Sequence, residues 1–241
     1  MDILLTGHAG YIGQCLAKRL STEHKITGLD LRYGQNLRTI PMSGSYDLII
    51  HLAGMSGVRE SMSNPAGYWQ NNVEAFQRLL TVFGKNTNTR ILYASSSSAA
   101  EPDLNPYAAS KFCMEQAAKR FSNTLGMRFH TVYNEKPRKG MLIQKIIDDE
   151  LTYITNHSRD FIHMEDLLDA IELLINSSYV GTIDIGSGVS VPIPSLAPGM
   201  PVHLANPGER LKTLANLEML KKLDYKPKYN VVTFLKELGK L

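Results

Sequence analysis

The sequence predicts an α/β fold in which helices cover both faces of a parallel sheet. Short apolar runs alternate with stretches of 3.6-residue periodicity through the first half of the chain, as in repeated βαβ units. A glycine-rich turn follows the first apolar run and opens the first periodic stretch. The 241 residues, 43% hydrophobic and 20% charged, can bury a sizeable core and favour one large α/β domain with a small appendage.

The individual elements follow from the same pattern. The expected strands are 3–6, 25–29, 48–52, 90–94 and 128–132. The expected helices are 11–20, 68–83 and 107–122, and Asn105-Pro106 before the last of them is a cap and turn signal. In a doubly wound sheet of this kind, ligands bind at the carboxyl ends of the strands.

The regular alternation fades after residue 133. We therefore predict a domain over residues 1–133 that carries the principal site. Residues 134–241 are expected to form mostly a small substrate-binding region, with some segments returning to the first domain's sheet. This region should contain a helix at 165–175, a strand at 181–185 and a terminal helix at 232–238.

Composition narrows the classes of partner. The net charge is only +3 and the basic residues are scattered, which argues against nucleic acid. Cys15 and Cys113 lie far apart, and the seven histidines lack metal-ligand spacing, so neither a disulfide framework nor a metal site is expected. No targeting segment and no apolar run long enough for a membrane span is visible. These features favour a reducing cytoplasm and no membrane.

A dinucleotide site is predicted at the first strand-to-helix turn. Gly7, Gly10 and Gly13 bring backbone N–H groups and the positive helix end, including Tyr11 and Ile12, toward a pyrophosphate. The second expected strand ends at Asp30, about 20 residues on, where a carboxylate binds the adenosine ribose. The conjunction indicates a Rossmann-like fold.

Asp30 also predicts which cofactor binds. A carboxylate accepts hydrogen bonds from both ribose hydroxyls and repels a 2′-phosphate, so NAD is expected rather than NADP. Arg32, two residues later on the same side of an extended chain, softens that preference.

The chemical site is expected on the third helix. Tyr107 and Lys111 are four residues apart and share one helical face. An ammonium about 6 Å from a phenol contributes roughly 3 kcal/mol at an effective dielectric constant of 20, or about two pKa units. The serine run 95–98 follows the fourth expected strand, where pockets of this fold open, and supplies a hydroxyl partner.

Taken together, these motifs resemble the extended short-chain dehydrogenases/reductases that include NAD-dependent nucleotide-sugar epimerases and dehydratases. The motifs are Gly7-x-x-Gly10-x-x-Gly13, Asp30, His51-Leu52-Ala53-Gly54, Asn71-Asn72-Val73, the serine run and Tyr107-x-x-x-Lys111. Further matches cover nearly the whole chain and are similar to UDP-glucuronate and UDP-glucose 4-epimerases. They are Gly57-Val58-Arg59, Arg128 to Tyr133 with Arg138, Arg159-Asp160-Phe161, Asp184 to Gly188 and Pro207-Gly208-Glu209.

The resemblance implies a role for each matched residue. Tyr107 would abstract a sugar hydroxyl proton while NAD takes hydride, Lys111 would lower the phenol pKa and bind the nicotinamide ribose, and Ser96 would bridge to the sugar. The implied cofactor contacts are Gly7, Gly10, Tyr11, Ile12, Gly13, Asp30, Leu52, Ala53, Gly54, Asn71, Tyr107 and Lys111. The implied contacts to a nucleotide-diphosphate sugar are Ser56, Arg59, Ser97, Arg138, Arg159 and Glu209. A homodimer through helices 68–83 and 107–122 is implied as well.

Several departures from the family pattern leave alternatives open. Ala100-Glu101 replaces the family's Tyr-Gly, Asn134-Glu135 replaces Gly-Pro, and the chain is shorter than the family's usual length. Ser97 and Ser98 stand where dehydratases carry Asp-Glu, which argues against dehydration. A 4-epimerase acting through transient oxidation at C4 is the first hypothesis. A 4-keto reductase or dehydratase, and a non-catalytic NAD-binding regulatory module, are the alternatives.

Overall fold

The computed structural model describes all 241 residues, which divide into two compact units. The first unit comprises Met1–Arg128 and Ser178–Ile183, and the second comprises Phe129–Ser177 and Asp184–Leu241. None of the helices has the length and apolar content needed to cross a bilayer. The predicted domain boundary after residue 133 stays a prediction.

The first unit is built on a parallel sheet with the strand order β2-β1-β3-β4-β5-β9. Strand β1 pairs in parallel with β2 and β3, and β3 pairs in parallel with β4. The chain therefore moves outward from β1 in both directions, which creates a switch point beside β1. The strands are β1 (Asp2–Thr6), β2 (Lys25–Leu29), β3 (Leu48–His51), β4 (Arg90–Ser96), β5 (Thr124–Phe129) and β9 (Gly181–Ile185).

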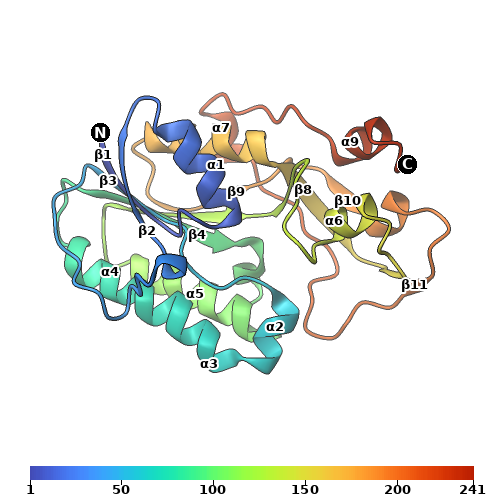
Figure 1. Cartoon of the computed structure of the whole chain (residues 1–241), viewed down its shortest axis with the longest axis horizontal. Helices are drawn as coiled ribbons and strands as arrows, with labels where there is room; N and C mark the ends of the chain where they lie inside the picture. Colours follow the sequence, from blue (N-terminus) through green and yellow to red (C-terminus); the bar gives the residue numbers. More distant parts are fainter. The chain divides into compact units, whose positions relative to one another are not determined.

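Helices cover both faces of this sheet, so the predicted α/β class is confirmed. Helix α1 (Tyr11–Leu20) lies on one face, and α4 (Ala75–Phe83) and α5 (Pro106–Ala118) lie on the other (Figure 1). Apolar residues of α4 and α5, among them Leu79 and Met114, pack against β-strand residues such as Ile49 in one buried cluster. Burial of this apolar stripe fixes both helices against the sheet.

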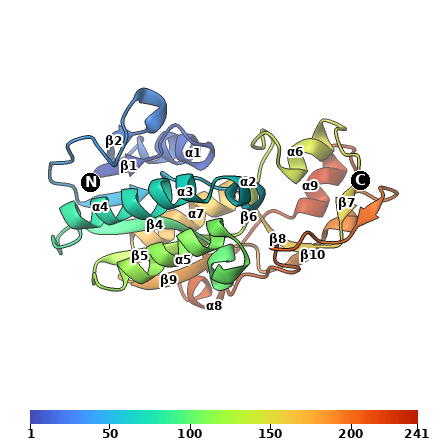
Figure 2. The ribbon, with the colours of Figure 1, turned by 90° about the horizontal axis from the view of Figure 1, so that it is seen from below.

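The helix expected at 68–83 contains three helical segments. They are α3 (Pro65–Tyr68), the π-helical segment η2 (Trp69–Glu74) and α4, and they follow α2 (Val58–Ser63) along the same side of the unit (Figure 2). A π-helical segment shifts the direction of the side chains that follow it, and such segments are frequent at functional sites.

The second unit contains two small sheets and four helices. Strand β8 (Ser158–His163) pairs in parallel with β6 (Thr131–Tyr133) and antiparallel with β10 (Ser190–Pro192). Strands β7 (Ile154–Thr155) and β11 (Val202–His203) form a parallel pair. The helices are α6 (Leu142–Ile147), α7 (Met164–Ile175), α8 (Glu218–Lys221) and α9 (Val231–Glu237).

Asp160 ties three segments of the second unit together. Its fully buried carboxylate accepts hydrogen bonds from the Ser187 N–H and hydroxyl, the Gly188 N–H and the Ala215 N–H at 2.7–3.0 Å. A buried carboxylate needs such donors to offset its desolvation. Asp160 therefore stabilises the loop after β9.

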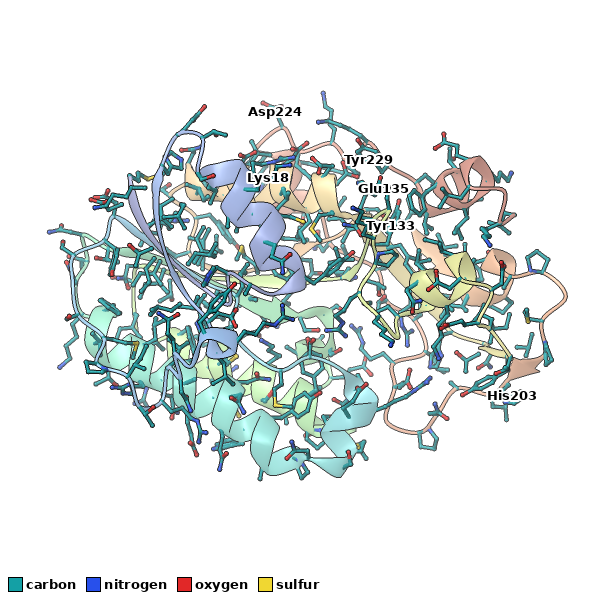
Figure 3. All side chains as sticks on the ribbon, in the orientation of Figure 1. Lys18, Tyr133, Glu135, His203, Asp224 and Tyr229 are labelled. Atoms are coloured by element: carbon teal, nitrogen blue, oxygen red, sulfur yellow. The ribbon has the colours of Figure 1, made fainter.

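His163 is the centre of an aromatic cluster in the same unit. Its ring stacks on Tyr229 with centroids 4.0 Å apart, and Tyr133 contacts it edge-on at 5.2 Å. Its Nδ1 accepts the Glu165 N–H, and its Nε2 lies 3.3 Å from a carboxylate oxygen of Glu135. Figure 3 shows Tyr133, Glu135 and Tyr229 close together. Glu135, which departs from the family pattern, thus gains a partner within the second unit.

Two expected elements were wrong in part. The strand expected at 128–132 is instead two strands, β5 and β6, which belong to different sheets and are separated by His130. Strand β5 contains Gly126, where a Cβ would approach the Tyr93 hydroxyl to 2.5 Å. Because glycine is uncommon inside strands, the sequence pattern did not predict the start of this strand. The helix expected at 107–122 ends at Ala118, whose carbonyl accepts the Thr124 hydroxyl.

Candidate functional site

The glycine-rich turn forms a close junction between β1 and α1. Gly7 has φ +74°, and a Cβ there would lie 2.6 Å from the Ala53 nitrogen. A Cβ at Gly13 would lie 2.1 Å from the Gly7 carbonyl oxygen. Helix α1 begins at Tyr11 with Gly10 as N-cap, without a side-chain cap or an acidic residue in its first turn. Its positive end is therefore suited to an anion such as a pyrophosphate.

Asp30 lies where β2 ends, beside the glycine turn. One carboxylate oxygen accepts the Ala9 N–H at 3.0 Å, and the other accepts the Arg32 N–H at 2.9 Å. The Arg32 guanidinium donates to the Ala9 carbonyl. The Asp30 carboxylate therefore binds the N–H of Ala9 and the Arg32 guanidinium binds its carbonyl. Arg32, the cation expected to soften the preference for NAD, thus lies next to Asp30.

The segment after β3 forms the other side of the turn. The Leu52 N–H donates to the Thr6 carbonyl at 3.0 Å, and the Ala53 backbone packs against Gly7. The Thr6 hydroxyl bonds to Nδ1 of His51 at 2.7 Å. The structure thus brings Leu52 and Ala53 to the glycine turn, whereas a Cβ at Gly54 would lie 2.7 Å from the Asn72 amide oxygen.

Asn72, rather than its predicted neighbour, fastens this segment to the helices. Its amide oxygen accepts the Met55 N–H at 2.7 Å, and its amide nitrogen donates to the Met55 carbonyl at 3.1 Å and to the Ser110 hydroxyl at 2.8 Å. The Asn71 amide donates to the Gly67 carbonyl at 2.8 Å. The cofactor contact expected for Asn71 stays a prediction. Sequence reasoning missed Asn72, although the Asn71-Asn72 pair was part of the matched pattern.

Helix α5 begins one residue before Tyr107. The Asn105 side chain caps it by accepting the Ala108 N–H at 2.8 Å, and Pro106 occupies its first turn. Tyr107 is half-buried, and its ring meets Tyr68 edge-on with centroids 6.0 Å apart. The Tyr68 hydroxyl donates to the Ser56 carbonyl at 3.0 Å. The Ser56 segment is therefore tied to the ring that packs against Tyr107.

Lys111, one turn along α5, is buried at the end of β4. Its ammonium donates to the Ala94 carbonyl at 2.8 Å and would lie 3.5 Å from a Cβ placed on Gly54. Burial lowers the pKa of Lys111 to about 8, and the neighbouring Glu115 carboxylate opposes that shift. A cation is thus held close to both Gly54 and the Tyr107 face of the helix.

Ser95 and Ser96 of the serine run have different hydrogen-bond partners. Ser95 donates to the Glu115 carboxylate at 2.6 Å, so its hydroxyl is engaged in the interior. Ser96 is buried and accepts the Ser98 N–H at 3.2 Å as the N-cap of η3 (Ser97–Ala100). Segments η3 and η4 (Pro102–Leu104) pack against α5. Ala100-Glu101, which replaces the family's Tyr-Gly, lies where these two short turns meet.

The remaining predicted substrate residues are distributed over both units. Arg59 is the second residue of α2 and is exposed in the first unit. Arg138 is exposed in the loop between β6 and α6 of the second unit. Arg159 and Glu209 are brought together in the second unit, with Nη2 3.6 Å from a carboxylate oxygen. Nη1 of Arg159 donates to the Arg210 carbonyl at 2.7 Å. His157, which sequence reasoning missed, lies 3.8 Å from the same Glu209 oxygen.

Comparison with known proteins identifies the family. The sequence model of the NAD dependent epimerase/dehydratase family matches residues 3–186. The chain belongs to this family. Its glycine turn, Asp30 and the Tyr107/Lys111 pair all lie within the matched region. The resemblance to extended short-chain dehydrogenases/reductases that depend on NAD is thereby confirmed.

Individual members of the NAD dependent epimerase/dehydratase family are distant in sequence but close in fold. Protein CapI of Staphylococcus aureus is 28% identical, over 73% of this chain and 69% of that protein. YtcB of Bacillus subtilis (strain 168), described as an uncharacterized UDP-glucose epimerase, is 26% identical over 77% of each. A Bacillus cereus UDP-glucuronic acid 4-epimerase variant, solved with a fluorinated UDP-sugar and NAD, has a TM-score of 0.87 at 21% identity. That match covers 100% of this chain and 98% of the solved one.

Proposed function

We propose that the chain is an NAD-dependent 4-epimerase that acts on a UDP-linked sugar. UDP-glucuronate and UDP-glucose are the first candidates for the substrate. The observation that carries the proposal is the placement of Lys111, whose buried ammonium lies beside Gly54 and one helical turn from Tyr107. A buried cation next to a phenol stabilises the phenolate, the base that sugar oxidation requires.

The residues of the first unit fit NAD. The uncapped N-terminus of α1 and the close Gly7–Ala53 contact leave backbone N–H groups for the pyrophosphate, and Asp30 stands where the adenosine ribose would bind. Gly10, Tyr11, Ile12, Gly13, Leu52, Ala53, Gly54 and Asn71 would complete this site. When bound, NAD supplies a hydride acceptor and donor.

Residues of the chain would transfer the proton of the sugar 4-hydroxyl. The Tyr107 phenolate would accept the proton of the sugar 4-hydroxyl, and the Lys111 ammonium would stabilise the negative charge before transfer. Ser96, with Ser97 beside it, would hold the sugar by a hydrogen bond. After the 4-keto sugar turns its other face, hydride would return to C4 and Tyr107 would return the proton to the C4 oxygen, so the cofactor would be unchanged over one cycle.

The nucleotide and sugar are expected to use the remaining predicted contacts. Arg159 and Arg138 would bind the diphosphate, because a guanidinium matches paired anionic oxygens. Glu209 would accept a ribose hydroxyl, and Ser56 and Arg59 would contact the sugar. The similarity to YtcB, described as a UDP-glucose epimerase, and to the Bacillus cereus UDP-glucuronic acid 4-epimerase supports a UDP-sugar substrate and 4-epimerisation.

The test is direct conversion of candidate substrates. Purified protein with NAD is incubated with UDP-glucuronate, UDP-glucose and their acetamido analogues, and proton NMR follows appearance of the C4 epimer. We expect conversion of at least one substrate that stops in the Tyr107→Phe variant. No conversion of any of them would defeat the 4-epimerase proposal.

A second measurement separates an epimerase from a reductase. With substrate deuterated at C4, an epimerase returns the same deuteride, so the product keeps its label and added NADH is not consumed. Net oxidation of NADH when a UDP-4-keto sugar is supplied instead would assign a 4-keto reductase.

We also propose that the chain forms a homodimer through α4 and α5. Trp69 and Val82, on the helical stretch that includes α4, are large exposed hydrophobic residues of the kind that interfaces bury. Light scattering should give twice the chain mass, and a Trp69→Glu variant should give the chain mass.

A further inference from the structure

Glu115 is a buried carboxylate that the proposed mechanism does not use. It lies one turn after Lys111 on α5, and its carboxylate accepts two hydrogen bonds from Arg128, at 2.8 and 2.7 Å. The Ser95 hydroxyl donates a third bond at 2.6 Å. Ser95 and Glu115 are each 3% exposed, whereas the Arg128 side chain is 25% exposed, so the carboxylate and the hydroxyl are the buried part of the network.

The network is linked to Lys111 in two ways, through the end of β4 and along α5. Ser95 directly follows Ala94, whose carbonyl accepts the Lys111 ammonium at 2.8 Å. Tyr107, Lys111 and Glu115 are spaced four residues apart and share one face of α5. The charge of Glu115 and the backbone that receives the ammonium are therefore linked by the Ser95 hydrogen bond.

The other groups near this ammonium carry no compensating charge. His51 on β3 is fully buried, and its pKa falls to about 3 because of burial and the Lys111 charge. Tyr93 on β4 is neutral, because burial and Glu115 raise its pKa while Arg128 opposes them. Tyr107 precedes Lys111 on α5, and Arg128 on β5 is cationic. Glu115 is thus the anion that acts on Lys111.

We infer that Ser95, Glu115 and Arg128 form a positioning network for Lys111. Glu115 supplies the buried negative charge that keeps the ammonium charged, and Ser95 ties this charge to the end of β4. Its three residues are not among the proposed contacts to substrate or cofactor, and the network acts through Lys111. The inference deepens the proposed function and rests on it for the role of Lys111.

The test measures Lys111 itself. The carbon next to the side-chain amine is followed by NMR in ¹³C-lysine-labelled protein as pH rises, and the Lys111→Met variant assigns its signal. Wild-type protein should titrate near the lowered pKa of about 8. Loss of the Glu115 charge in Glu115→Gln should lower this midpoint by about one unit. Glu23→Gln, at an exposed glutamate of the same unit, should leave it unchanged.

Two further variants make the result specific. Glu115→Asp keeps the charge and should restore most of the wild-type midpoint. Glu115→Gln combined with Arg128→Met removes both partners, so no charge is left unpaired if the single variant does not fold. The midpoint should fall in this double variant as well. A midpoint that stays at the wild-type value without Glu115, or that falls equally in Glu115→Asp, would overturn the inference.

The rate of epimerisation supplies a second readout. The alkaline limb of the pH–rate profile should move to lower pH in Glu115→Gln by the same amount as the NMR midpoint. A shifted NMR midpoint in a protein that converts no UDP-sugar would reject the proposed function and leave the network. Turnover with an unshifted midpoint would reject the network and leave the function.

Discussion

The buried imidazole of His51 stays neutral beside the Lys111 ammonium. His51 bonds to Thr6 through Nδ1 and stacks on Phe76 with centroids 5.2 Å apart. Burial, and after it the Lys111 charge, lowers the pKa of His51 to about 3. Of these two buried groups, Lys111 therefore carries the positive charge and His51 on β3 is neutral.

This depressed pKa predicts acid sensitivity. The unfolded chain takes up a proton on His51 near pH 6.5, whereas the folded chain does so near pH 3, so stability falls as pH drops through this window. Between pH 7 and pH 5 the loss attributable to His51 is about 2 kcal/mol. Urea unfolding at both pH values should show that His51→Phe, which keeps the aromatic stack, loses less stability than wild type. Equal losses would contradict the assignment.

Lys111 predicts a second rise in stability with pH, in the alkaline range. Its folded pKa of about 8 lies below the unfolded value, so the unfolded chain binds more protons between pH 8 and 10.5 and stability rises with pH. From pH 7 to pH 9.5 the gain is about 2 kcal/mol. Lys111→Met should lack this gain when unfolding is measured at the two pH values. A gain retained in Lys111→Met would show that the ammonium is not buried as described.

Replacing Asp160 by Asn is expected to loosen the structure locally. In Asp160→Asn an amide nitrogen replaces an oxygen that faces N–H donors, so at least one donor is left unpaired, at a cost of about 1–3 kcal/mol. Hydrogen exchange should accelerate at the amides of Ser187, Gly188 and Ala215. Asp224→Asn, at an exposed aspartate of the same unit, is the control. Unchanged exchange at those three amides would remove Asp160 from its structural role.

The position of Arg32 is expected to limit the preference for NAD over NADP. Its guanidinium is fastened to the Ala9 carbonyl beside the Asp30 carboxylate, where it would offset repulsion of a 2′-phosphate. In Arg32→Ala the preference for NAD over NADP should grow about tenfold, a difference of about 1.4 kcal/mol. Calorimetric Kd values for both dinucleotides measure this, with Arg120→Ala, an exposed arginine at the end of α5, as control. An unchanged ratio would exclude Arg32 from the site.

Sequence reasoning located the features that have a local signature. The Gly7–Gly13 spacing, the carboxylate at Asp30 and the four-residue step from Tyr107 to Lys111 follow from short-range patterns, and α1 has the expected bounds. Asn72 and Glu115 act through partners 17 and 13 residues or more away, so only the fold shows what they hold. Strand β5 begins at Thr124 and contains Gly126, whose close approach to Tyr93 no local pattern contains.

The most direct test of the central claim is the rate of C4 epimerisation by Tyr107→Phe. The variant removes one oxygen and keeps the ring that packs against Tyr68. With general acid–base catalysis lost, the rate should fall by about 10²- to 10⁴-fold while the melting temperature stays at the wild-type value. A variant that epimerises its UDP-sugar at the wild-type rate would contradict the assignment of Tyr107 as the proton-transfer group.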